Sequence, residues 1–273
     1  MQLFPVLMVL GLFPVPKING DLAHYAVYKS FQNAFHECAE YLEVSNCTLQ
    51  RINGNSYPNT EQVQRLIHCT LVNVGAWNSD QVAVKSHVLQ NFFRPVSGDV
   101  CHQNRTQQCL KHINRDPEDH FGRAFESFQC FYHQYGNIVS SAQYIPFEIN
   151  EIYRLVETAI AIHNIPRRAL EEYSKGNILE EPHFRALHLT GALFGGYYSF
   201  KDGLKLDNAY SQFGTPELLT AETRQCCDAA AREECGADHA TKLYRIFKNC
   251  LEDIVPTLKL VRTVAEKIVF NLS

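Results

Sequence analysis

Apolar residues recur at helical spacing in several parts of the chain. One such series consists of Ile149, Ile152, Leu155, Ala159 and Ile162. Intervals of three and four residues place these side chains on one face of an α-helix, which predicts a helix over this segment. Runs that alternate between apolar and polar residues, the pattern of a half-buried strand, are scarce. The hydrophobic pattern therefore predicts an all-α protein.

Proline and glycine residues divide the second half of the chain into segments. Pro166 fits the first turn of a helix and Gly176 fits its end, because proline fixes a helical φ and glycine accepts the left-handed conformation that follows many helices. Pro182 opens a further predicted helix, which ends at Gly195 and Gly196. These residues predict two short helices after the first one.

An apolar stripe near the C-terminus predicts one more helix. Its members are Leu251, Ile254, Leu258, Val261, Val264 and Ile268. Pro256 either kinks this helix or marks its true start, because proline disrupts a helix interior. Two interpretations remain open: the helix packs on the second half of the chain, or it covers a cavity mouth or a groove between domains.

The N-terminus carries an apolar run of 13 residues, Leu3 to Val15. It is too short for a membrane span but has the length of a signal-peptide core. We expect residues 1–20 to be a signal peptide that is cleaved near Gly20. No second apolar stretch reaches membrane length, so the sequence predicts a secreted, extracellular protein that does not associate with membranes.

Charge and motifs exclude several functions. The formal net charge is -4, which argues against nucleic acid as a partner because nucleic-acid binders carry basic patches. The usual catalytic signatures for hydrolases, zinc proteases and phosphate-binding loops are missing. Paired carboxylates such as Glu171 and Glu172 fit solvated helix faces. We therefore expect no enzymatic activity, no catalytic residues and no cofactor.

The two halves of the chain resemble each other faintly. Residues 65–78 align with residues 185–199, where Trp77 falls on Tyr198, and Phe128 falls on Phe247 further along. Several aligned positions at nearly one offset indicate a tandem duplication. The sequence thus predicts two domains, residues 21–143 and 144–273, with a junction between Ser140 and Phe147.

The ten cysteines indicate disulfide bonds. They are Cys38, Cys47, Cys69, Cys101, Cys109, Cys130, Cys226, Cys227, Cys235 and Cys250. An even number in a secreted chain is typical of disulfides, and neither a C-x-x-C pair nor a zinc-type Cys and His spacing occurs, so we expect no metal site. Two sequons predict glycosylation at Asn46 and Asn104.

The cysteine pattern of the first half resembles that of a known family. Cys38 lies in FHECAEYLEVS, Cys69 in RLIHCTLVN, and Cys130 in RAFESFQCFYHQYG, with Cys109 between the last two. These residues match the first, third, sixth and fourth cysteines of the insect odorant-binding proteins. The chain is most similar to the two-domain, "atypical" mosquito type, and the resemblance covers residues from about 25 to 255.

The resemblance implies the disulfides Cys38–Cys69 and Cys109–Cys130. Arg65 and Phe121 stand at the second and fifth cysteine positions, which pair with each other in the family. The joint loss of both cysteines leaves no orphan thiol, and it makes Arg65 an expected surface residue and Phe121 an expected core residue. Cys47 and Cys101 are left over, and we pair them with each other by elimination.

The second half departs further from the family pattern. Non-cysteine residues occupy the first, second, third and fifth positions, namely Ala159, Ala186, Thr190 and Thr241. The fourth position matches Cys226 or Cys227, and the sixth matches Cys250. Cys235 would pair with whichever neighbour is left, so the pairing of these four cysteines stays open.

The resemblance implies two bundles of about six helices, each able to enclose an apolar cavity, and the carriage of small hydrophobic ligands such as odorants, pheromones or lipids. An alternative is a secreted structural or interaction protein of saliva, the reproductive tract or an egg covering, which would have a protein partner. We expect most aromatic residues to be core and a minority to line a cavity. The candidates are Trp77, Phe92, Phe93, Phe128, Phe131, Tyr132, Phe194, Tyr197, Tyr198, Phe213 and Phe247.

Relatives in this family release ligand at low pH, which the resemblance makes a hypothesis for this chain. Histidine titrates near pH 6.5, and His68 and His120 lie next to Cys69 and Phe121. The favoured interpretation of both histidines is still that they are ordinary, partly exposed side chains.

Overall fold

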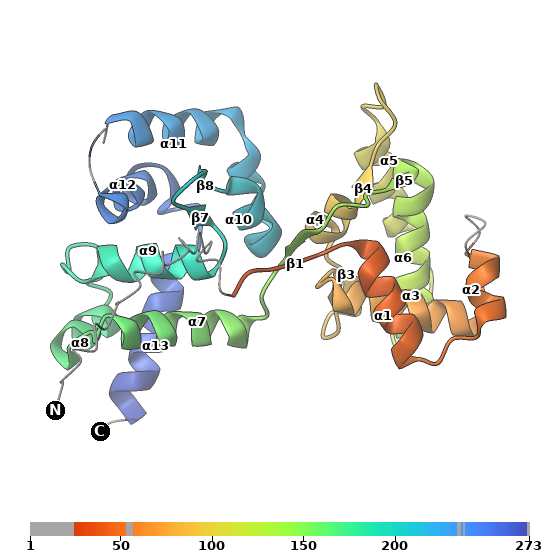
Figure 1. The fold of residues 1–273 in the computed structure, drawn as a ribbon, viewed down its shortest axis with the longest axis horizontal. Coiled ribbons are helices and arrows are strands. Elements are labelled where there is room, and N and C mark those ends of the chain that lie inside the picture. Colours follow the sequence, from red (N-terminus) through yellow and green to blue (C-terminus); the bar gives the residue numbers. More distant parts are fainter. Residues whose placement is uncertain (1–24, 53–56, 234–235, 237, 272–273) are drawn as a thin grey trace, which may run out of the picture.

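A computed structural model describes residues 25–52, 57–233, 236 and 238–271. The predicted signal peptide and Cys235 lie outside these residues. The described part of the chain is all-α, because its strands are only two or three residues long. Its helices gather in two groups that are joined by extended segments (Figure 1). None of the described helices has the length and apolar character needed to cross a membrane.

The first group comprises residues up to 138. Its helices are α1 (Phe31–Tyr41), α2 (Asn46–Ile52), α3 (Glu61–Asn73), α4 (Ser86–Leu89), η1 (Gln90–Phe92), α5 (His102–Lys111) and α6 (His120–Tyr135). Its strands are β1 (Val27–Lys29), β2 (Trp77–Asn78), β3 (Ala83–Val84), β4 (Phe93–Arg94) and β5 (Asn137–Ile138). The pairs β2–β3 and β4–β5 are antiparallel, and β6 (Gln143–Ile145) leads on to the second group.

The second group comprises the rest of the described chain. Its helices are α7 (Ile149–Ile162), α8 (Arg167–Lys175), α9 (Phe184–Phe194), α10 (Leu206–Phe213), η2 (Pro216–Leu219), α11 (Ala221–Glu233), α12 (His239–Ile246), η3 (Phe247–Leu251) and α13 (Thr257–Asn271). Its strands, β7 (Tyr198–Ser199) and β8 (Gly203–Leu204), form an antiparallel pair.

Proline and glycine mark helix ends where the sequence predicted them. Pro166 is the N-cap of α8, and Gly176 follows the helix at φ 94°, a conformation that glycine adopts without strain. Gly195 is the C-cap of α9. Helix α13 begins immediately after Pro256, so this proline marks the start of the helix and does not kink it.

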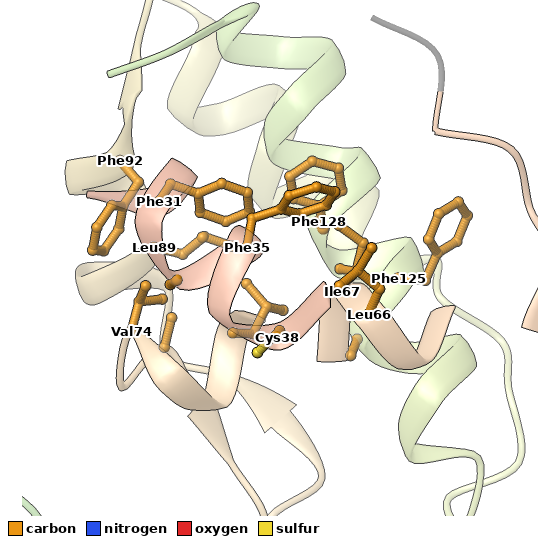
Figure 2. Packing of buried hydrophobic residues seen from close by; sticks show 14 of the residues in the cluster. Phe31, Phe35, Cys38, Leu66, Ile67, Val74, Leu89, Phe92, Phe125 and Phe128 are labelled. Atoms are coloured by element: carbon orange, nitrogen blue, oxygen red, sulfur yellow. The ribbon is translucent and has the colours of Figure 1, made fainter. Parts of the chain in front are cut away.

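Stacked aromatic rings fill the core of the first group (Figure 2). Phe31 and Phe128 stack with their ring centroids 5.5 Å apart, and both side chains are at most 1% exposed. Phe92 packs on Phe31 at 6.2 Å. Helices α1, α3 and α6 supply most of this cluster, and the buried apolar side chains of the second group form clusters of their own.

Two sets of contacts join the groups. Strand β1 pairs with β6, with Val27 opposite Ile145. Tyr144 of β6 donates a hydrogen bond to the carbonyl oxygen of Gly195 at 3.0 Å, and the Gln212 side-chain amide donates one to the carbonyl oxygen of Phe147 at 2.9 Å. The extended segment is thus fixed to α9 and α10.

Helices α4 and α10, which begin after Lys85 and Lys205 in corresponding places, touch each other. In η1, which continues α4, Asn91 Nδ2 donates to Ser211 Oγ of α10 at 2.8 Å, and Gln90 Nε2 donates to the Tyr210 hydroxyl at 3.1 Å. Each pair is 120 residues apart, close to the offset of the sequence repeat. Corresponding residues therefore meet each other, as they do in a contact across a two-fold axis.

Three disulfides crosslink the described helices. Cys38–Cys69 joins α1 to α3, and Cys109–Cys130 joins α5 to α6, as the resemblance implied. Cys226–Cys250 joins α11 to η3. This last bond decides one open alternative: Cys226 pairs with Cys250, whereas Cys227 is buried and free.

The pairing of Cys47 with Cys101 was wrong. Both residues are exposed and free. Cys47 lies in α2 and Cys101 is the N-cap of α5, and these helices lie apart in the first group (Figure 1). A disulfide needs its two Cα atoms within about 7 Å, so neither cysteine can reach the other.

Arg65 and Phe121 contact each other where the family has a disulfide. The Arg65 guanidinium carbon lies 5.3 Å from the centroid of the Phe121 ring, a cation–π contact. Phe121 is 38% exposed, so its expected role as core filling was wrong. A surface contact replaces the crosslink, and the proximity of these two side chains supports the cysteine alignment.

We expect iodoacetamide to modify Cys47 and Cys101 in the native, unreduced protein and to spare Cys227. The first two thiols are exposed, whereas burial raises the pKa of Cys227 to about 11 and leaves little reactive thiolate. Peptide mass spectrometry before and after unfolding distinguishes the two classes. A crosslinked Cys47–Cys101 peptide would contradict the structure.

Candidate functional site

An apolar cavity of about 90 Å³ lies within the second group of helices. Its wall is formed by α7, α9, η3 and α13, together with residues from β8, α10 and α12. The lining contains no Lys, Arg, Asp or Glu among the described residues. Ligand sites are typically concave and mostly apolar with a few polar groups, so this cavity is the candidate site.

Small residues leave the space open where α7 faces α9. Ala159 of α7 and Gly191 and Ala192 of α9 all line the cavity. A Cβ atom on Gly191 would meet only Leu155 Cδ2, at 3.6 Å, which is an ordinary van der Waals distance. Larger side chains at these positions would fill the cavity.

One turn of π-helix, η3, forms part of the wall. Phe247 and Leu251, at its two ends, both line the cavity. The same turn contains Cys250, whose disulfide ties it to α11. Single π-helical turns are rare and occur frequently at functional sites, and this turn aims two large apolar side chains at the same space.

His188 is a titratable side chain in the cavity wall. Its ring stacks on Phe184, with centroids 5.4 Å apart and planes 9° apart, and it packs on Phe247 at 4.7 Å. Its Nδ1 atom is buried and has no hydrogen-bond partner within the described residues. Burial lowers the pKa of His188 to about 4, so the ring is neutral at physiological pH.

Tyr197 is the second polar aromatic residue in the wall. Its hydroxyl is buried and makes no hydrogen bond of good geometry in the described part of the chain, but the Tyr144 side chain lies close enough to lower its pKa. The ring packs on Phe213 at 5.6 Å and lies so close to Gly195 that a Cβ atom there would clash. Burial raises the pKa of Tyr197, so its hydroxyl stays protonated.

We expect the stability of the protein to fall between pH 6.5 and pH 4 because His188 binds a proton only after unfolding. Its pKa is about 4 in the folded chain and about 6.5 when exposed. The unfolded state therefore binds more protons in this window, and stability that is fully present above pH 6.5 is lost on acidification. The loss attributable to His188 would reach roughly 3 kcal/mol.

Urea midpoints at pH 7 and pH 4.5, compared between the protein and a His188→Phe variant, measure this effect. His68 and His87, whose pKa values burial also lowers, are present in both proteins and cancel in the comparison. The same acid destabilisation in both proteins would contradict the prediction.

The cavity contains three of the eleven aromatic candidates: Tyr197, Phe213 and Phe247. The six candidates of the first half lie in or against the packed core of the first group, and none lines this cavity. They are Trp77, Phe92, Phe93, Phe128, Phe131 and Tyr132. Ligand contact by any of the eleven stays a prediction.

The last two candidates have other neighbours. Tyr198 is buried and its hydroxyl lies 2.7 Å from His239 Nδ1. Phe194 packs on Tyr25, with ring centroids 4.8 Å apart. Both residues hold segments together and lie outside the cavity wall.

Sequence reasoning missed His188 and the role of Gly191. The sequence did offer one indication of His188, because it is a histidine on an otherwise apolar helix face. Gly191 lies inside α9, where glycine usually weakens a helix, and it lines the cavity. A single sequence does not show which of its glycines line a cavity, because the facing side chains decide this.

The two histidines of the pH hypothesis lie together in the first group. The rings of His68 and His120 are 6.3 Å apart, and His68 also contacts Phe121 at 5.1 Å. Burial, and then the neighbouring His120, lower the pKa of His68. A role for this pair in ligand release stays a prediction.

The C-terminal helix packs on the second half of the chain, and covering a cavity mouth or a groove between domains stays a prediction. Helix α13 packs against α8 and α7, and Leu260 and Val261 on it line the cavity.

The glycosylation candidates Asn46 and Asn104 are exposed, and their modification stays a prediction. The described residues contain no group of three or more side chains suited to hold a metal ion.

Comparison with known proteins agrees with the cysteine pattern. Residues 24–134 match the model of the PBP/GOBP family. General odorant-binding protein 69 of Anopheles gambiae is 27% identical to this chain over 161 residues, which cover 55% of this chain and 69% of the relative. No solved structure matches the chain significantly.

The family match falls on the first group of helices, which contains the family disulfides Cys38–Cys69 and Cys109–Cys130. The two-domain type within the family stays a prediction. On the matching residues, the shared cysteine framework and the helical fold, residues 24–134 of this chain are similar to the PBP/GOBP family of insect odorant-binding proteins.

Proposed function

We propose that the protein is a secreted carrier that binds small hydrophobic ligands, odorant-like or lipid, without covalent chemistry, in the cavity of the second group of helices. The observation that carries this proposal is the apolar wall of that cavity, which includes the π-helical turn η3 and two polar aromatic side chains. The family and the name of the Anopheles relative support a carrier role.

We further propose that residues 21–143 and 144–273 are two domains with different tasks. The packed aromatic core of the first, which has the family match, favours a structural role. The open space in the second favours ligand binding. Transfer of apolar area from water into this space would supply the binding free energy, at roughly 25 cal/mol per Å² before entropic costs.

The size of the cavity limits its ligands. Its volume is about 90 Å³, whereas a cavity of about 150 Å³ accommodates benzene. A ligand of six or more heavy atoms must therefore move part of the wall. Phe247 and Leu251 on η3 are two large side chains whose displacement would enlarge the space, because both line it.

Two measurements on the secreted protein test the carrier proposal. Native mass spectrometry followed by organic extraction identifies any ligand that copurifies. Thermal unfolding in the presence of hexane, hexan-1-ol or toluene should show a rise in Tm, because a ligand that binds only the folded state stabilises it by about 2.7 kcal/mol at a hundred times its Kd.

An empty protein whose Tm is unchanged by all three compounds would contradict the carrier proposal. The alternative, a secreted structural or interaction protein, would then be the function to test. Secretion itself is measured by expressing the full chain in insect cells and sequencing the N-terminus of the protein in the medium.

A further inference from the structure

One polar side chain of the cavity wall has a buried atom without a partner. His188 Nδ1 is buried and unpaired among the described residues, whereas the Tyr197 hydroxyl has the Tyr144 side chain as a neighbour. Buried polar atoms are nearly always paired in folded proteins, so an unpaired one calls for an explanation. An unpaired imidazole nitrogen on a lining residue of an apolar cavity indicates that a partner is missing there.

Ordered water is a poor candidate for that partner. A buried water molecule typically makes about three hydrogen bonds, and Thr257 is the only other residue of the wall with a polar side chain. The rest of the lining is aliphatic or aromatic, apart from Gly191. A ligand that brings one hydrogen-bonding group on an apolar body matches this wall better.

The charge of the wall restricts that group further. No lysine or arginine is among the described lining residues, so a carboxylate would lose its hydration with no cation to replace it. His188 stacks on Phe184 and packs at a tilt against Phe247, and it remains neutral, since burial lowers its pKa to about 4. A neutral imidazole has one donor and one acceptor, which suits an alcohol or a ketone.

We infer that the cavity selects neutral, monofunctional ligands, alcohols or ketones on a short apolar body, over carboxylic acids, and that His188 is the residue that pairs with their oxygen. This inference rests on the proposed carrier function and adds the chemical class of the ligand. Tyr197 lies in the same wall, but its hydroxyl has Tyr144 as a neighbour, so His188 alone carries the assignment.

Hexane, hexan-1-ol and hexanoate at pH 7.4 form a matched series for the test, because they share one chain length. Their Kd values are measured by calorimetry on the full secreted protein and on two variants. His188→Phe keeps an aromatic ring against Phe184 and Phe247, and Tyr197→Phe removes only the hydroxyl.

In the unmodified protein, hexan-1-ol should bind at least as tightly as hexane, and hexanoate at least a hundredfold more weakly than hexan-1-ol. In His188→Phe, the ratio of the hexan-1-ol Kd to the hexane Kd should rise at least tenfold. Tyr197→Phe should raise the same ratio by a smaller factor.

An unchanged ratio in His188→Phe would overturn the assignment of His188, whatever Tyr197→Phe does. Hexanoate binding as tight as that of hexan-1-ol would overturn the ligand class. In both of these outcomes hexane still binds, so the carrier proposal stands. Failure of all three compounds to bind the unmodified protein would instead overturn the carrier proposal, and with it this inference.

Discussion

A Gly191→Leu variant should lose at least about 30-fold in affinity for small hydrophobic ligands, equivalent to roughly 2 kcal/mol. Gly191 lines the cavity from inside α9, and only Leu155 lies near the position of a Cβ atom. A leucine side chain would therefore extend into the open space and occupy the volume that a ligand needs. Binding is measured by the ligand-dependent Tm and by calorimetry with hexan-1-ol.

Gly191→Ala is the matched control. Its single methyl group would lie 3.6 Å from Leu155 Cδ2, and alanine stabilises a helix interior by up to about 1 kcal/mol relative to glycine. The alanine variant should be at least as stable as the unmodified protein and keep its affinity within about threefold. A folded leucine variant with unchanged affinity would place the ligand outside this cavity.

A Phe128→Ala variant should destabilise the first group of helices by about 3–5 kcal/mol. The Phe128 ring is fully buried and contacts Phe31 at 5.5 Å and Tyr57 at 4.8 Å. Its removal leaves a cavity that the rings on several sides cannot close. Denaturant unfolding followed by tyrosine fluorescence and circular dichroism measures the loss of stability.

Val96→Ala is the control for this experiment, because Val96 is 60% exposed and its truncation should change stability by no more than about 0.5 kcal/mol.

Ligand binding tests whether the cavity of the second group depends on the core of the first group. Under conditions where Phe128→Ala is still folded, its affinity for hexan-1-ol should match that of the unmodified protein, since the cavity lies in the other apolar cluster. Loss of binding would show that the ligand depends on the first core.

The sequence predicted the fold where local chemistry decides it. The spacing of apolar residues predicted α7, and Pro166, Gly176 and Pro256 predicted helix ends, because each acts through its own backbone geometry. The resemblance implied two disulfides correctly. It did not help with Cys47 and Cys101, whose separation depends on where whole helices pack.

The site was harder to predict than the fold. Phe128 and Phe247 align in the repeat and are both buried, yet one lies in a filled core and the other lines a cavity. Helical spacing is the same for both. The difference comes from Ala159, Gly191 and Ala192, small residues on facing helices that leave space, and from the π-helical turn η3, for which the sequence offers no clear pattern.

The contact between α4 and α10 has a consequence for how the two groups stay together. The side-chain hydrogen bonds there come from η1, Asn91 to Ser211 and Gln90 to Tyr210, and within the described residues they are few and polar. Two separate chains would associate weakly through them. In this chain the segment from Gly136 to Glu148 links the two surfaces covalently. A short linker holds each surface near the other at an effective concentration in the millimolar range. An interface too weak for a dimer can therefore stay closed within one chain.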